Sequence, residues 1–250
     1  GLRYGLYNNY TDFAPTNEHW REDLVGRLPD GEWQTAWFRC YSPKPKRIAE
    51  FASRIVPVLQ DKFQLSGAYC DVHTAITPWS RVDYDARLPG AAMMLSQFHA
   101  YGQVLYHQQQ TWNGPVYSEG GSHWYYAGLV TGNKSDDRGY NLAHDPWLVD
   151  FDLRKLHPLG TSIGLGKRHS FATEWAGDRA MATDDWDRFF AGTIAFGHVG
   201  EFFNWRFGRI SSLMVRSYYM LAALQKRYAA NAVETIRYAE DQMALARFDD

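Results

Sequence analysis

Short apolar runs alternate with longer segments along most of this chain. Six runs of small, β-branched and aromatic residues are bounded by polar or turn-forming residues, as strands are: about 2–7, 34–39, 68–71, 116–118, 149–153 and 194–198. Several of the segments that separate these runs have helical periodicity. The alternation predicts an α/β fold made of consecutive βα units.

Two of the longer segments are expected to be crossover helices. Residues 46–63 carry apolar side chains three or four positions apart, on one helical face: Ile48, Phe51, Ile55, Val58 and Leu59. Residues 89–110 begin with a Pro-Gly pair and repeat this spacing: Met94, Phe98, Tyr101 and Leu105. Pro57 predicts a kink in the first helix, because proline cannot donate the backbone hydrogen bond of its turn.

Towards the end of the chain, a third helix is expected over about 209–227. The following stretch "VETIRYA" is compatible with a strand or with a last helix, and its cluster of Val, Thr, Ile and Tyr favours the strand. We therefore expect residues 1–230 to form a catalytic barrel domain and residues 231–250 to begin a following segment, interpreted as a β domain.

Consecutive βα units build either a doubly wound sheet or a (β/α)8 TIM-type barrel. In both folds the functional side chains gather in loops beyond the carboxyl ends of the strands. The chain opens on a strand-like run without an initiator Met. With six strands, this favours a partial barrel whose first one or two strands precede this fragment.

Composition and charge exclude several classes of function. The chain has 250 residues, 45% of them hydrophobic and 22% charged, which is enough for one sizeable core. A formal net charge of -2 and the absence of any Lys or Arg run leave no basic surface for nucleic acid. No stretch is apolar over a length that would span a membrane.

Motifs for cofactors and disulfides are also missing from the sequence. There is no Gly-x-Gly-x-x-Gly motif and no phosphate-binding loop, so no cofactor is expected. Cys40 and Cys70 lie far apart, and Cys70 falls within a predicted strand, so both are expected to be free thiols.

Two carboxylates stand at the ends of successive predicted strands. Asp71 follows "GAYC", and Glu119 follows "PVYS" one βα unit later. Gly120 and Gly121 then allow the backbone to turn without a Cβ atom. If the two strands are neighbours, both acids face one cleft. There, one carboxylate would attack the anomeric carbon of a sugar or activate water, while the other protonates the leaving oxygen.

Other polar and aromatic residues that follow strand ends are candidate substrate contacts: Asp12, His73, Trp79, His123, Trp124 and Asp152. Trp79 and Trp124, together with Tyr125 and Tyr126, would offer flat apolar faces to the C–H surfaces of a sugar. Each candidate also has an ordinary structural explanation, such as a turn or cap for an Asp and a core position for a Trp.

At these residues the sequence resembles a known group of enzymes. The stretches "GAYCDVHTAITPW", "GPVYSEGGSHWYYAGLVTG" and "VDFDLRKLHPLG" are similar to the catalytic barrel of retaining glycoside hydrolases related to the endo-α-N-acetylgalactosaminidases. They are more distantly similar to α-galactosidases, and the resemblance covers roughly residues 1–205.

The resemblance implies that Asp71, in its Tyr-x-Asp setting, is the nucleophile and that Glu119 is the acid/base. It also implies an α-linked carbohydrate or glycoconjugate as substrate. A secreted, cell-surface or periplasmic location would follow from that function, although the sequence itself carries no localisation signal.

Two other functions are compatible with the same residues. In a metal-dependent hydrolase, Asp71 and His73 would alternate onto one side of a strand, and other histidines would complete the site: His99, His107, His123, His144 and His157. No His-x-His or His-Glu-x-x-His pair supports this reading. In a non-catalytic barrel, the aromatic residues would bind sugar without any reaction.

Overall fold

The computed structural model describes residues 3–134, 160–162, 212–228, 231, 233–240 and 243–248. The chain forms two compact units, Gly1–Asn133 and Lys134–Asp250, which are described separately below.

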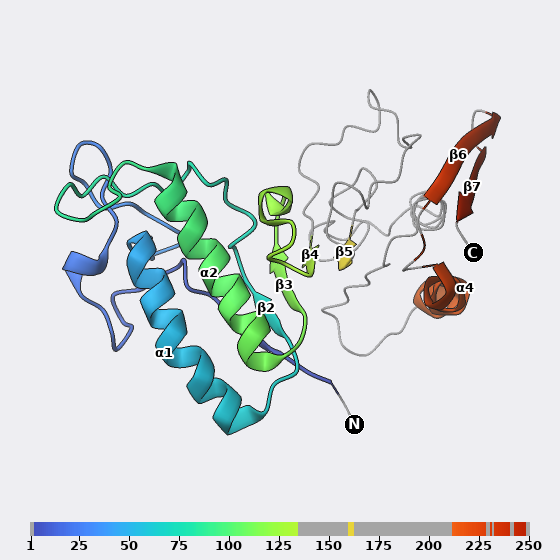
Figure 1. The fold of residues 1–250 in the computed structure, drawn as a ribbon, viewed down its shortest axis with the longest axis horizontal. Helices are drawn as coiled ribbons and strands as arrows, with labels where there is room; N and C mark the ends of the chain where they lie inside the picture. The colour runs from blue at the N-terminus through green and yellow to red at the C-terminus, as the bar shows by residue number, and fades with distance from the viewer. Residues whose placement is uncertain are drawn as a thin grey trace. The chain divides into compact units, whose positions relative to one another are not determined.

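The first unit is built around a sheet whose strands follow the chain order: β1 (Leu6–Asn8), β2 (Ala68–Cys70), β3 (Val116–Glu119) and β4 (Gly132–Lys134). β1, β2 and β3 are parallel and pair in register, with Asn8 beside Cys70 and Cys70 beside Ser118. Helix α1 (Pro45–Phe63) connects β1 to β2, and helix α2 (Met94–Trp112) connects β2 to β3 (Figure 1). The α/β fold with a parallel sheet is thus confirmed.

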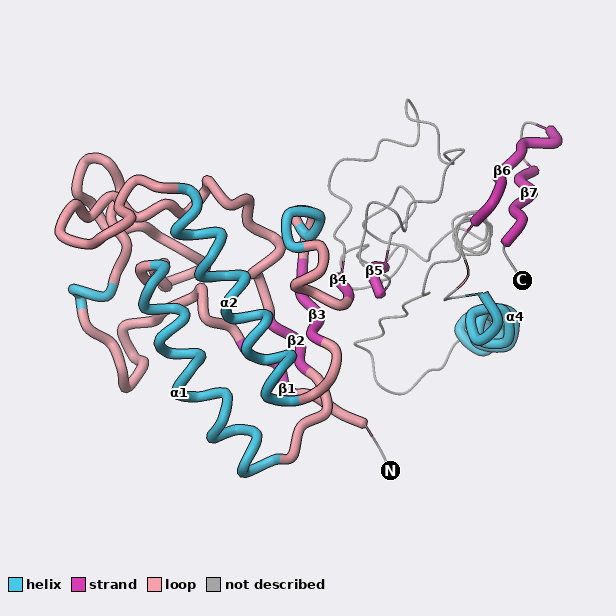
Figure 2. The backbone as a smooth tube through the Cα atoms, viewed as in Figure 1, coloured by secondary structure: helices cyan, strands magenta, loops and turns pink. Residues whose placement is uncertain are grey.

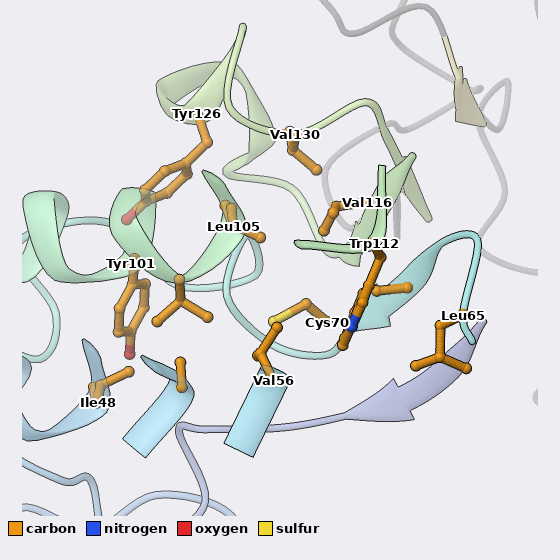
Figure 3. Close-up of a cluster of buried hydrophobic side chains, with 13 residues drawn as sticks. Ile48, Val56, Leu65, Cys70, Tyr101, Leu105, Trp112, Val116, Tyr126 and Val130 are labelled. Carbon is orange, nitrogen blue, oxygen red and sulfur yellow. The ribbon is translucent and has the colours of Figure 1, made fainter. Parts of the chain in front are cut away.

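The two helices lie side by side against one face of this sheet (Figure 2). Side chains from both helices and from β2 and β3 form the core shown in Figure 3, in which Cys70 lies among Val56 of α1 and Trp112 of α2. Burying each large apolar side chain of this kind contributes about 1.5–3 kcal/mol. The core therefore holds β2 and β3 firmly beneath the loops that follow them.

Helix α1 forms where it was expected, but its buried stripe is narrower than predicted. Ile48, Ala52 and Val56 are buried, whereas Val58, expected on the same face, is 63% exposed. These three buried residues follow one another at intervals of four, so the side chains that pack inward form an i, i+4 row that does not coincide with the largest side chains. The small Ala52 lets α1 approach its neighbours closely along this row. Pro57 lies inside the helix, and the kink expected there stays a prediction.

Helix α2 begins later than predicted, at Met94 rather than at Pro89. Gly90 and Ala92 both have positive φ, so the backbone turns there and cannot continue as a right-handed helix. Tyr101 and Leu105 are buried as expected, while Met94 is exposed at the first turn.

The strand expected at 34–39 does not form. Thr35 makes only an isolated bridge to Tyr41, and Arg39 has a φ of 57°, which breaks an extended run. Trp37 and Phe38 are each 73% exposed at the tip of this loop. The aromatic side chains that suggested a strand therefore lie on a turn.

Two short 3-10 helices, η1 (Glu22–Leu24) and η2 (His123–Tyr126), lie in loops of the first unit. The described part of the second unit contains β5 (Gly160–Ser162), α4 (Ser212–Tyr228), β6 (Val233–Glu240) and β7 (Met243–Phe248). β6 and β7 pair antiparallel, so the strand interpretation of "VETIRYA" is confirmed.

The helix expected at 209–227 corresponds to α4. The strands expected at 149–153 and 194–198 lie outside the described residues. The domain boundary at 230 stays a prediction. No helix within the described residues is long and apolar enough to cross a membrane.

Candidate active site

Three neighbouring strands share a pattern of a tyrosine, a residue facing the helices and a polar residue: Tyr7-Asn8-Asn9, Tyr69-Cys70-Asp71 and Tyr117-Ser118-Glu119. On the helix side, Gln108 of α2 donates hydrogen bonds to Asn8 Oδ1 at 3.0 Å and to Cys70 Sγ at 3.3 Å. Side chains alternate along a strand, so the three tyrosines point to the opposite side. We call the side that bears Tyr7, Tyr69 and Tyr117 the open face.

Exposure along the strands agrees with this assignment. Tyr7 is 64% exposed and Tyr117 is 38% exposed, whereas Cys70 and Ser118 are fully buried. The rings of Tyr7 and Tyr69 stack with centroids 6.1 Å apart and planes inclined by 27°. The open face thus presents an aromatic row from adjacent strands.

Asp71 lies one residue beyond β2 and remains attached to the sheet. Its backbone N–H donates to Asn8 O at 2.8 Å, which continues the ladder towards β1. Its side chain turns to the open face, where the hydroxyl of Tyr7 donates to Asp71 Oδ2 at 2.7 Å. Partial burial and this hydrogen bond raise the pKa of Tyr7 to about 12, so its phenol stays protonated at neutral pH and can donate this hydrogen bond.

Glu119 is the last residue of β3, two positions after Tyr117, and therefore belongs to the open face as well. Because Cys70 pairs with Ser118, Asp71 and Glu119 occupy the next positions of neighbouring strands. Parallel strands lie about 4.8 Å apart. Register and alternation therefore give Asp71 and Glu119 neighbouring backbone positions at the carboxyl ends of β2 and β3.

The loop after β2 turns sharply away from the strand. Val72 has a φ of 67°, and the imidazole of the next residue, His73, is fully buried. His73 Nδ1–H donates to Asp71 O at 2.9 Å, and the ring packs against Tyr101 with centroids 4.7 Å apart. Burial lowers the pKa of His73 to about 4. His73 is thus a neutral side chain beneath the loop and faces the helices.

Hydrogen bonds tie this loop to the end of β3. Ser118 Oγ donates to Cys70 O at 2.6 Å, and Thr74 Oγ1 donates to Glu119 O at 2.7 Å. Thr74 also contacts the side chain of Asn133 in β4, whose amide donates to Gly120 O at 2.6 Å. This buried network joins three strands through the backbone carbonyls of Cys70, Glu119 and Gly120.

His123 belongs to the same buried layer. Its Nδ1 lies 3.1 Å from Gly120 O, and only 3% of the residue is exposed. Burial lowers the pKa of His123 below its usual value. Like His73, this histidine supports the backbone of a loop from beneath.

Among the exposed aromatic side chains on the loops that follow β2 and β3, Trp79, Trp124 and Tyr125 form a cluster. Trp79 is 53% exposed, and its ring and that of Tyr125 form a T-shaped pair with centroids 5.4 Å apart. Tyr125 in turn lies 5.8 Å from Trp124, which is 54% exposed. Tyr126, grouped with them on sequence grounds, is fully buried in the core instead.

Asp12 is held by its own loop after β1 and by the loop after β2. Asn9 Nδ2 donates to Asp12 Oδ2 at 2.8 Å, Trp37 N–H donates to Asp12 Oδ1 at 3.3 Å, and Arg81 Nη1 lies 3.7 Å from the same oxygen. The carboxylate therefore fixes two loops at the end of β1. Asp152 lies outside the described residues.

Sequence reasoning missed Tyr7, the only described side chain shown to donate a hydrogen bond to the Asp71 carboxylate. The sequence does contain a pattern that could have identified Tyr7, because a tyrosine stands two positions before a polar residue at the end of all three strands. Within the described part of the chain, no three His, Cys, Asp or Glu side chains are grouped as metal ligands would be.

Neither protein-family models nor curated proteins match this sequence. The fold, by contrast, is similar to solved structures of glycosidases. An α-N-acetylgalactosaminidase from Bifidobacterium bifidum aligns with a TM-score of 0.67 at 13% identity, over 99% of this chain and 39% of that one. A second structure of that enzyme, in complex with GalNAc, gives 0.65 at 10% identity, over 99% of this chain and 40% of that one.

Two α-galactosidases share the fold as well. A GH36 α-galactosidase from Geobacillus stearothermophilus, in complex with stachyose, gives a TM-score of 0.56 at 13% identity, over 99% of this chain and 36% of that one. The enzyme from Thermus thermophilus, in complex with p-nitrophenyl α-D-galactopyranoside, gives 0.53 at 15% identity, over 98% and 50%. This chain thus spans half or less of the length of these glycosidases.

Proposed function

We propose that this chain is part of the (β/α)8 barrel of a retaining glycoside hydrolase that cleaves α-linked sugars. The observation that carries the proposal is the placement of Asp71 and Glu119 on one face, at the carboxyl ends of paired parallel strands. Retaining enzymes hold their two carboxyl groups about 5–5.5 Å apart, which is close to the spacing of adjacent strands. The α-linkage is suggested by the α-glycosidases that share the fold.

In the proposed reaction, Asp71 Oδ1 attacks the anomeric carbon while the bond to the leaving oxygen breaks and Glu119 protonates that oxygen. Water then attacks the glycosyl-enzyme, Glu119 accepts its proton, and the bond between the sugar and Asp71 breaks. Oδ2 of Asp71 already accepts the hydrogen bond from Tyr7, which leaves Oδ1 as the attacking atom.

The sugar would lie against the exposed rings of Trp79 and Trp124, which belong to the loops after β2 and β3. Asp152 is retained as a proposed contact. For Asp12, His73 and His123, we propose indirect roles, since their side chains are occupied with holding the loops in place.

The test is turnover of p-nitrophenyl α-galactoside and α-N-acetylgalactosaminide by the complete protein and its variants. Asp71→Asn and Glu119→Gln should each lower kcat at least a thousandfold, with circular dichroism unchanged. Asp61→Asn, at an exposed site on α1, is the matched control and should turn over normally.

The stereochemistry of the product separates the two roles. With azide present, Asp71→Gly should form a glycosyl azide of inverted anomeric configuration, because azide replaces the nucleophile from the same face. Glu119→Ala should instead give the retained azide. Normal turnover in Asp71→Asn would disprove the assignment, and sugar binding without turnover by the unmodified protein would favour the non-catalytic alternative.

A further inference from the structure

The contact between Tyr7 and Asp71 joins two strands diagonally across the open face. Tyr7 pairs with Tyr69, and Asp71 lies two residues beyond Tyr69, so the phenol must reach along the strand direction to the carboxylate. Diagonal neighbours of this kind lie within reach of a long aromatic side chain. The hydroxyl that binds Asp71 therefore belongs to the neighbouring strand β1 and not to the loop that carries Asp71.

Both partners of this contact are held in place. Stacking on Tyr69 fixes the ring of Tyr7, and the backbone N–H of Asp71 is bonded to Asn8, the residue that follows Tyr7. The Asp71 carbonyl also accepts the hydrogen bond of His73 Nδ1–H. The hydrogen bond to Oδ2 thus has a defined geometry even though Tyr7 is 64% exposed.

We propose that Tyr7 is a positioning residue that holds Asp71 Oδ2, aims Oδ1 at the substrate and stabilises the carboxylate as it leaves the glycosyl-enzyme. This inference rests on the proposed function, because it assumes that Asp71 is the nucleophile.

The charge on Asp71 determines which of the two reaction steps the hydrogen bond from Tyr7 accelerates more. In the free protein the carboxylate is negative, and a hydrogen bond from a phenol to it is charge-assisted. In the glycosyl-enzyme Asp71 is a neutral ester, Oδ2 is its carbonyl oxygen, and the same hydrogen bond is weaker. As water attacks and the electron pair of the sugar–Oδ1 bond returns to Asp71, the negative charge reappears and the hydrogen bond strengthens. Tyr7 should therefore accelerate the second step more than the first.

The first test is the pre-steady-state kinetics of Tyr7→Phe with an aryl α-glycoside whose leaving group departs readily. The variant keeps the ring that stacks on Tyr69 and removes only the hydroxyl. Hydrolysis of the glycosyl-enzyme should slow about tenfold, the loss expected for one hydrogen bond to a charged group. A burst of released phenol should then approach one equivalent per active site, with kcat and KM both lowered. Tyr106→Phe, on the exposed side of α2, is the control and should show no added burst.

The second test does not depend on activity. The protein is labelled with 3-fluorotyrosine, and the Tyr7 resonance is assigned by its absence in Tyr7→Phe. Asp71→Asn should lower the pKa of Tyr7, because the amide carries no negative charge to oppose ionisation of the phenol.

The outcomes separate this inference from the proposed function. If Asp71→Asn abolishes turnover while Tyr7→Phe shows unchanged burst and kcat, the positioning role is wrong and the proposed function stands. If Asp71→Asn remains active, the proposed function fails and the inference fails with it. An unchanged Tyr7 titration in Asp71→Asn would show that the two side chains do not interact.

Discussion

Gly120 lies so close to Ala75 that a Cβ atom on Gly120 would be 2.3 Å from Ala75 Cα. Gly120 directly follows Glu119, and Ala75 lies in the loop that carries Asp71. No side chain fits between the two backbones, so the loops after β2 and β3 pack as one layer. This close approach, together with the hydrogen bond from Thr74 to Glu119, fixes one carboxylate relative to the other.

The first prediction concerns this backbone contact. Gly120→Ala should lower the free energy of unfolding by about 2–4 kcal/mol, since strain at a φ of 96° adds to overpacking against Ala75. Turnover should fall as well, because the loops must separate. Urea denaturation measures the stability change.

Gly31→Ala is the matched control for this substitution. Gly31 has a φ of 89°, but nothing lies within 4 Å of an added Cβ atom. The free energy of unfolding of this variant should fall by only about 1 kcal/mol, which is the cost of holding an alanine in a left-handed backbone conformation. Equal losses in the two variants would show that the contact with Ala75 is unimportant.

A second prediction concerns the exposed aromatic cluster. Trp79→Ala should raise KM about fivefold and change kcat little, because the ring binds the sugar face without touching the reacting bond. Tyr106→Ala removes an aromatic side chain of equal exposure, 53%, from α2 and should leave KM unchanged. A Trp79 variant with normal KM for every active glycoside would remove this ring from the substrate site.

The third prediction concerns stability at acidic pH. His73 has a folded-state pKa of about 4, below its ordinary value of 6.5, because burial penalises the charged imidazole. Between these values the unfolded chain binds more protons than the folded protein, so stability falls as the pH falls. The part of the free energy of unfolding that depends on His73 should be fully present above about pH 6.5 and should decline by on the order of 3 kcal/mol towards pH 4.

His73→Gln provides the comparison, because glutamine does not titrate. Urea denaturation of both proteins between pH 7.5 and pH 4 gives two stability curves, and carboxylates contribute to both. The unmodified protein should show the steeper decline. Parallel curves would mean that His73 is solvated and titrates alike in the folded and unfolded states.

Local patterns in the sequence were sufficient for most of the first unit. The periodicity of residues 46–63 identified α1, and the small and aromatic residues before Asp71 and Glu119 identified β2 and β3. The same reasoning failed at 34–39, where Trp37 and Phe38 have strand-like composition but occupy an exposed turn. Composition cannot reveal the left-handed backbone of Arg39 that ends the extended run.

The alternation along each strand determined, from sequence alone, that Asp71 shares a side with Tyr69 and that Glu119 shares a side with Tyr117. Only the tertiary structure decided that β2 pairs with β3 in register and that Tyr7 reaches Asp71 from β1. It also decided that His73 points inward, because the positive φ of Val72 reverses the chain where simple alternation would have placed the imidazole beside Asp71. Periodicity is a property of neighbouring residues, whereas register and packing depend on segments brought together from distant parts of the chain.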